Sequence, residues 1–145
     1  MSLPIWIVVA NGSRARLLQR KGPSQALVEV HNWVHPAARQ HRDDLPQGHR
    51  QSGIQARSGL APRQSIQDRE REVFAREIMQ WLSHELNNHA ASSVALLSSN
   101  PFLGEMLAHQ HQGQLHRQVC ATHAIDLTSL PLQQLSQRLR EDYRL

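Results

Sequence analysis

The feature that most constrains the fold is an unbroken apolar run at Ile5–Ala10, IWIVVA. It is rich in β-branched residues and ends at turn residues, which is typical of a strand buried on both faces. Asn11-Gly12 follows at once and is the strongest short signal for a β-hairpin, because both residues tolerate the positive φ of a tight primed turn. Residues 14–18 (RARLL) then indicate a second strand that alternates arginine with apolar side chains. We therefore predict a central strand that turns into an antiparallel neighbour.

The size and composition favour one ordinary domain. A chain of 145 residues can bury about two-thirds of its unfolded surface without disulfides or metals, so we expect a single domain over residues 1–145. The N-terminus shows neither a basic leader nor a cleavage site, and no run reaches the roughly 18 apolar residues of a membrane span. We expect a cytoplasmic protein without membrane insertion. The only cysteine, Cys120, lies in an apolar stretch that indicates a buried thiol.

The next elements are a third strand and a long helix. Residues 26–34 favour a strand that continues the meander, and Pro36 stops it. Ser65 and Asp68 have the spacing of a capping box at the start of a helix. Apolar side chains then recur at helical spacing and predict a stripe that packs on the sheet: Phe74, Ile78, Trp81, Leu82 and Leu86.

The last third of the chain alternates short strands with helices. Residues 94–97 and 118–121 favour strands. Between them Asn100 is the expected N-cap of a helix with Pro101 at its first position. A final helix from about Pro131 is expected to bury four side chains: Leu132, Leu135, Leu139 and Tyr143. The order β-β-β-α-β-α-β-α predicts an α/β domain with a five-stranded mixed sheet, whose later strands run parallel to the first.

Residues 37–64 form a long connection without usable periodicity. It carries five arginines and only two acidic residues, Asp43 and Asp44. The arginines are Arg39, Arg42, Arg50, Arg57 and Arg63. Connections of this length are uncommon, and we consider both a solvated loop and a nucleic-acid-binding segment. Arginines of the long helix have acidic neighbours within one turn and are partly neutralised.

Polar residues also follow the predicted parallel strands. Because carboxyl ends of parallel strands meet at one edge, these residues should line a crevice there. They are Asn11, Gly12, Ser13, Arg14, Ser98, Ser99, Asn100, Gly104, Thr122, His123 and Asp126. Free amides at the helix beginning near Asn100, together with Arg14, would suit an anion. The alternative is that these residues only make turns and caps.

The motifs of catalysis and metal binding are missing from the sequence. A nuclease built on such a sheet needs several carboxylates, one of them from the first strand, and that strand has none. The chain has ten histidines, but they do not have the spacing of a zinc site, and no G-x-S-x-G elbow occurs. We therefore expect a non-enzyme without metal or cofactor.

Four segments resemble the host-attachment protein family, bacterial proteins described as required for attachment to host cells. They are residues 6–17 (WIVVANGSRARL), 74–78 (FAREI), 100–104 (NPFLG) and 126–131 (DLTSLP). The family is similar to the middle domain of archaeal and eukaryotic peptide-chain release factors and Pelota, which implies an RNase H-like sheet. In release factors the long loop carries a Gly-Gly-Gln tip, whereas residues 47–53 here read QGHRQSG. The family often has Asp at the position of Asn11.

Two functions agree with these observations. One is a non-catalytic module that binds RNA or the ribosome through its arginine-bearing loop. The other is a protein-interaction or regulatory factor that acts indirectly on host-cell attachment.

Overall fold

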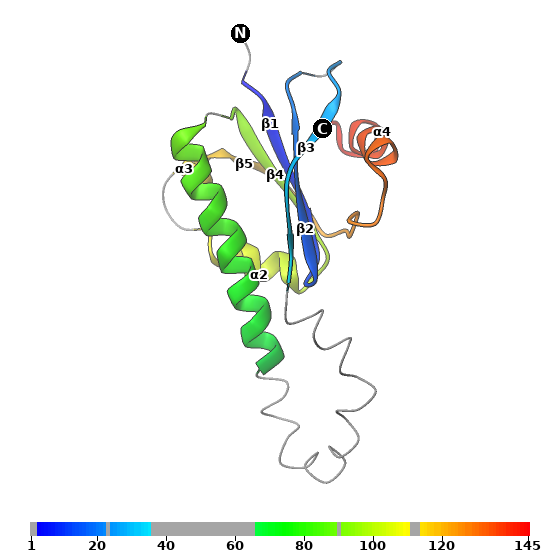
Figure 1. Ribbon diagram of the computed structural model, residues 1–145. Helices are drawn as coiled ribbons and strands as arrows, with labels where there is room; N and C mark the ends of the chain where they lie inside the picture. Colours follow the sequence, from blue (N-terminus) through cyan, green and yellow to red (C-terminus); the bar gives the residue numbers. More distant parts are fainter. Residues whose placement is uncertain (1–2, 23, 36–65, 90, 111–113) are drawn as a thin grey trace.

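The computed structural model describes residues 3–22, 24–35, 66–89, 91–110 and 114–145, which form one sheet with helices on both faces (Figure 1). The strands are β1 (Ile5–Ala10), β2 (Arg14–Arg20), β3 (Leu27–Val34), β4 (Ser93–Ser98) and β5 (Val119–His123). The helices are one over residues 66–88, called the long helix below, and α2 (Phe102–Ala108), α3 (Gln114–Gln118) and α4 (Leu132–Tyr143).

The sheet has the order β3-β2-β1-β4-β5, with β1 at its centre. β1 is antiparallel to β2 and parallel to β4, and β4 is parallel to β5. The predicted α/β domain with a mixed five-stranded sheet is confirmed. The predicted order of elements lacked α3, and Gln118 ends that short helix instead of opening β5. An RNase H-like classification stays a prediction, and so does the single domain over residues 1–145.

Each face of the sheet has its own core. The long helix and α2 cover the face that presents Val8 and Leu96, and α4 covers the face of Ile7 and Leu97. Alternate side chains of β1 and β4 thus enter different cores, which explains why both strands are apolar without interruption. No helix in the described ranges is long and apolar enough to cross a membrane.

The predicted helix stripes are mostly confirmed, with exceptions at Trp81, Leu132 and Tyr143, of which Tyr143 is half-buried. Phe74, Ile78, Leu82 and Leu86 are buried, but Trp81 keeps part of its surface exposed and packs on β3, against the rings of His31 and Trp33. In α4, Leu135 and Leu139 are fully buried, whereas Leu132 is 36% exposed. Leu132 is the first residue of α4 and therefore lies at the margin of the core.

The thiol of Cys120 is exposed, so the expectation of a buried cysteine is wrong. Cys120 lies on β5, an edge strand whose only neighbour among the described strands is β4. The burial pattern of β5 alternates between exposed and intermediate residues, because this strand has less covering than β1 or β4. Residues 36–65, which include the connection with the five arginines and the Ser65 cap, lie outside the described residues.

Candidate functional site at the strand ends

The turn between β1 and β2 is built by the side chain of Asn11. Its Oδ1 accepts hydrogen bonds from the main-chain N–H groups of Ser13 (2.7 Å) and Arg14 (2.9 Å). The N–H of Asn11 donates to the carbonyl of Arg14 at 2.9 Å, so Gly12 and Ser13 are the central residues. Neither Asn11 nor Gly12 has a left-handed φ, and the predicted primed turn is therefore wrong. An asparagine side chain can satisfy turn amides itself, which removes the need for that geometry.

The other end of the Asn11 side chain reaches the segment that precedes α4. Its Nδ2 donates to Oδ2 of Asp126 (2.9 Å) and to Oγ1 of Thr128 (3.1 Å). Asp126 Oδ1 accepts from the N–H and the hydroxyl of Thr128, at 2.9 and 2.6 Å. Burial acts to raise the pKa of Asp126, but the hydrogen bonds from Thr128 and Asn11 outweigh it and hold that pKa below its ordinary value. We call Asn11, Asp126 and Thr128 the strand-end network.

A buried arginine on β2 extends this network to β3. Arg16 is 6% exposed and donates to the carbonyls of Thr128 (3.0 Å) and Leu130 (2.6 Å). Its guanidinium also forms an ion pair with Glu29 on β3 at 2.8 Å. The hydrogen bond from Arg16 lowers the pKa of Glu29, although burial opposes the shift. Sequence reasoning missed Thr128 and Arg16; the available signal was that Arg16 alternates with core residues in a strand of a sheet covered on both faces.

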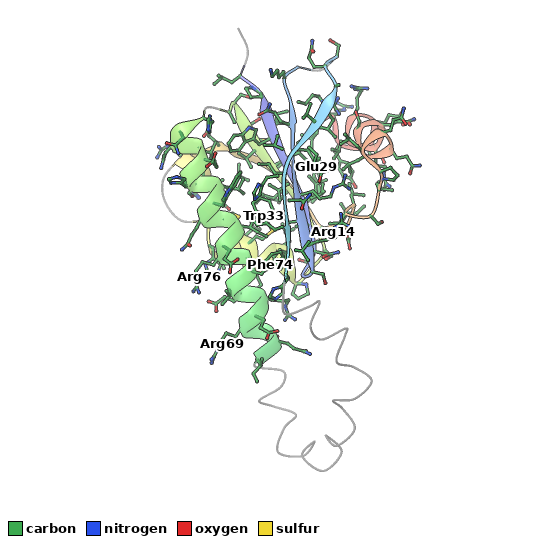
Figure 2. All side chains as sticks on the ribbon, in the orientation of Figure 1. Arg14, Glu29, Trp33, Arg69, Phe74 and Arg76 are labelled. Carbon is green, nitrogen blue, oxygen red and sulfur yellow. The ribbon has the colours of Figure 1, made fainter. Side chains whose placement is uncertain are left out.

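The long helix meets the turn from the opposite face. The N–H of His35 donates to the carbonyl of Ser13 at 2.8 Å, and the His35 ring stacks on Phe74 with centroids 4.8 Å apart. A Cβ at Gly12 would lie 3.5 Å from Cδ of Arg71, so Arg71 lies over the turn. Figure 2 shows Phe74 and Trp33 between the long helix and the sheet, whereas Arg69 and Arg76 point away from it.

The residues at the start of α2 form a separate group. α2 begins at Phe102 with Pro101 at the N-cap position, after a cis Asn100–Pro101 bond and without a side-chain cap. The expectation of Asn100 as N-cap with Pro101 inside the helix is therefore wrong. The N–H of Leu103 already donates to the carbonyl of Ser99 at 3.0 Å. In the described ranges no hydrogen bond joins Ser99, Asn100 or Gly104 to the strand-end network.

The predicted crevice residues thus fall into two sets. The structure brings together Asn11, Gly12, Ser13, Arg14 and Asp126, with Arg14 and Asp126 exposed. At the end of β5, His123 packs on Tyr143 with ring centroids 4.6 Å apart. Among the described residues no group of three metal-ligating side chains occurs. Since both oxygens of Asp126 already accept hydrogen bonds, the arrangement is suited to joining β1, β2 and the segment before α4.

Comparison with models of protein families matches residues 6–139 to one family, described as "Protein required for attachment to host cells". A search of curated proteins found no match. The matched residues include β1 except for its first residue, the other four strands and most of α4.

Proposed function

Because this chain belongs to the family of proteins required for attachment to host cells, we propose that it serves that role as a non-catalytic binding module. Its ligand is RNA, either free or in the ribosome, and the binding takes place in the cytoplasm. The observation that carries the proposal is the distribution of charge along the chain. The proposal also includes that the chain is similar to the middle domain of release factors.

The positive charge is concentrated in the connection over residues 37–64. Five arginines and two aspartates give it a net charge of +3, out of +4 for the whole chain. The remainder has eleven basic and ten acidic side chains, since the totals are sixteen and twelve. A polyanion that neutralises arginines releases counterions, which makes such a segment a favourable phosphate-binding element.

The strand-end network supports a binding role over a catalytic one. A general base needs a carboxylate or imidazole that can reach a substrate proton. Asp126 instead accepts hydrogen bonds from Asn11 and Thr128, and its lowered pKa keeps it ionised at neutral pH. The Asn11 amide is likewise engaged at both of its ends.

A salt series on RNA binding tests the proposal. Log affinity should fall linearly with log salt concentration, with a slope of about −0.7 per phosphate contact on single strands. Replacing Arg39, Arg42, Arg50 and Arg57 with Gln should then flatten the slope by roughly two to three units. The melting temperature should stay nearly unchanged. Sedimentation of the tagged protein with ribosomes from a lysate extends the same test to the ribosome.

A second variant with the same loss of charge provides the control. Arg69, Arg76, Arg117 and Arg138 lie on helices of the described fold, and replacing them with Gln should leave most of the slope in place. RNA binding that is undetectable for the wild type even at low salt would refute the proposal. An equal flattening in both variants would show that affinity follows net charge alone.

The edge strand β3 favours a second candidate, a protein-interaction role. Among the described strands β3 pairs only with β2, and three of its valines are exposed: Val28 (52%), Val30 (47%) and Val34 (48%). An unpaired edge with apolar side chains is a template for strand addition by a partner chain. Val28→Lys with Val30→Lys should abolish capture of such a partner, whereas high salt should not. RNA binding should survive these two substitutions.

A further inference from the structure

A solvent-open hollow of about 490 Å³ lies at the other end of the strands from the strand-end network. It is bounded by the start of β1, the end of β2, the start of β4 and the end of α4, which Figure 1 shows at the same end of the molecule. Among the described residues that line it, four side chains are basic and none is acidic. The basic residues are Arg20, Lys21, Arg140 and Arg144, and apolar contact surface comes from Leu3, Ile5 and Leu145.

Arg20 is the buried member of this group, with 2% of its surface exposed. Its hydrogen bonds go to the main-chain oxygens of Gln25 (2.9 Å), Leu145 (2.8 Å) and Ser136 (3.2 Å), and to the Ser136 hydroxyl (3.2 Å). These contacts fix the guanidinium, and none of them comes from an acidic side chain. Burial and the positive charge of Arg140 both lower the pKa of Arg20, as expected where cations gather without an anion.

The acidic residues of α4 are engaged elsewhere. Asp142 accepts from Arg138 at 2.5 Å, and Glu141 accepts from Gln137 at 3.1 Å. Within the described part of the chain, no ion pair reaches Lys21, Arg140 or Arg144. Even if the main-chain oxygen of Leu145 belonged to a carboxylate, the lining would keep three positive charges in excess.

Arg144 occupies a position that local geometry would give to glycine. It caps the C-terminus of α4 with φ 58° and ψ 34°, the left-handed conformation that side chains with a Cβ adopt at a cost. Arg144 adopts this unfavourable backbone conformation, and it places a fourth cation at the hollow.

We propose that this hollow binds a small phosphorylated ligand, a phosphate monoester with an apolar or aromatic body of nucleotide size. The volume is within the range of about 300–1,000 Å³ for small-molecule sites and too small for a macromolecule. Arginine forks match phosphate oxygens, and a phosphate monoester brings the charge that the lining lacks. Leu3, Ile5 and Leu145 provide the surface on which the rest of the ligand packs.

Isothermal titration calorimetry with adenosine 5′-monophosphate tests the site. The wild type should bind one molecule, inorganic phosphate should compete, and adenosine without its phosphate should not bind measurably. Arg140→Gln with Arg144→Gly should weaken the affinity about tenfold or more, since two charge-assisted contacts are lost. Because glycine favours the left-handed φ of position 144, this variant should melt no lower than the wild type.

The matched control is Arg76→Gln with Arg117→Gln, which removes the same charge from exposed positions outside the lining. It should change the affinity by no more than about twofold, because solvent screens distant charges. Equal weakening in both double variants would overturn the proposal, and so would binding of adenosine as tight as that of the monophosphate. Absence of binding to the wild type at about 1 mM would also overturn it, since two ion pairs in a pocket this size should exceed that affinity. The variant lacking the four arginines of residues 37–64 should retain full affinity, so failure here is distinguishable from failure of RNA binding.

Discussion

At the scale of single residues, Asn11 joins parts of the chain that are more than a hundred residues apart in sequence. Its acceptor end holds the turn between β1 and β2, and its donor end holds Asp126 and Thr128. Four hydrogen bonds therefore depend on one short side chain, and neither Ala nor Ser could make both sets. The same residue closes the turn and fixes the segment that leads into α4.

Asn11→Ala should destabilise the protein by about 2 kcal/mol. Each hydrogen bond contributes about 1 kcal/mol net when buried, and two of the four lie in exposed surroundings, which reduces their contribution. Urea unfolding measures the loss. Asn88→Ala is the control, because Asn88 makes one exposed hydrogen bond to His84 and should change stability by less than about 0.5 kcal/mol. Equal effects from the two variants would contradict the role given to Asn11.

Stability should fall as pH drops through the acidic range. A hydrogen bond from Arg16 lowers the pKa of Glu29. Burial acts to raise the pKa of Asp126, but the hydrogen bonds from Thr128 and Asn11 lower it below its ordinary value. A carboxyl with a lowered pKa in the folded state stabilises fully above its unfolded pKa of about 4, and that stability disappears as pH falls through the folded value. Urea unfolding between about pH 7 and pH 3 should show this fall in the wild type. The double variant Glu29→Gln with Asp126→Asn should be less stable than the wild type at pH 7, and its stability should fall less as the pH drops. Parallel stability curves for the two proteins would contradict the role given to these carboxyl groups.

At the scale of elements, hydrophobic periodicity predicts which face of a helix is buried better than it predicts how deeply. Phe74, Ile78 and Leu82 lie along the centre of the stripe and are buried as expected. Trp81 lies at its flank, where burial depends on the position of the edge strand β3. Cys120 shows the same effect on β5. An apolar sequence on an edge strand does not reveal that one side has no neighbour.

The candidate site was predictable to the extent that topology determines it. The rule that carboxyl ends of parallel strands meet places Asn11 near Asp126, and their hydrogen bond confirms that proximity. Thr128 and Arg16 were not predictable, because their contacts depend on side-chain direction, which the rule about strand ends does not give. The basic hollow was also missed. The same rule places ligands at the carboxyl ends of the parallel strands, whereas the hollow lies at the start of β1 and β4.

Ile78→Ala should cost about 2–5 kcal/mol, since it removes buried methyl groups and leaves a cavity under the long helix. Trp81→Ala should cost less than Ile78→Ala, because part of the indole is exposed. Thermal and urea unfolding provide the comparison, with the exposed Glu77→Ala as control. A larger loss for Trp81 would mean that contacts with His31 and Trp33 outweigh the central stripe.

At the scale of the whole molecule, protection should decrease from the middle of the sheet to its edges. β1 is paired on both sides and covered on both faces, whereas β3 and β5 each have one neighbour among the strands that the structure describes. Opening free energies follow burial and hydrogen bonding, so native-state hydrogen exchange should be slowest for the amides of β1. The amides of Val30 and Cys120 should exchange much faster. Comparable rates for β1 and β3 would mean that the sheet opens only as a unit.

The pairing of the central strand also allows the longest connection to change in evolution without a change in the fold. β1 pairs with β2 across a short turn, but its parallel partner begins only at Ser93, so closing that pairing spans most of the chain. Closure entropy grows with the logarithm of length, and doubling a flexible connection costs only about 0.6 kcal/mol. Residues added or removed between β3 and the long helix therefore change the free energy of unfolding little. Selection can alter the length and charge of that connection while the sheet stays the same.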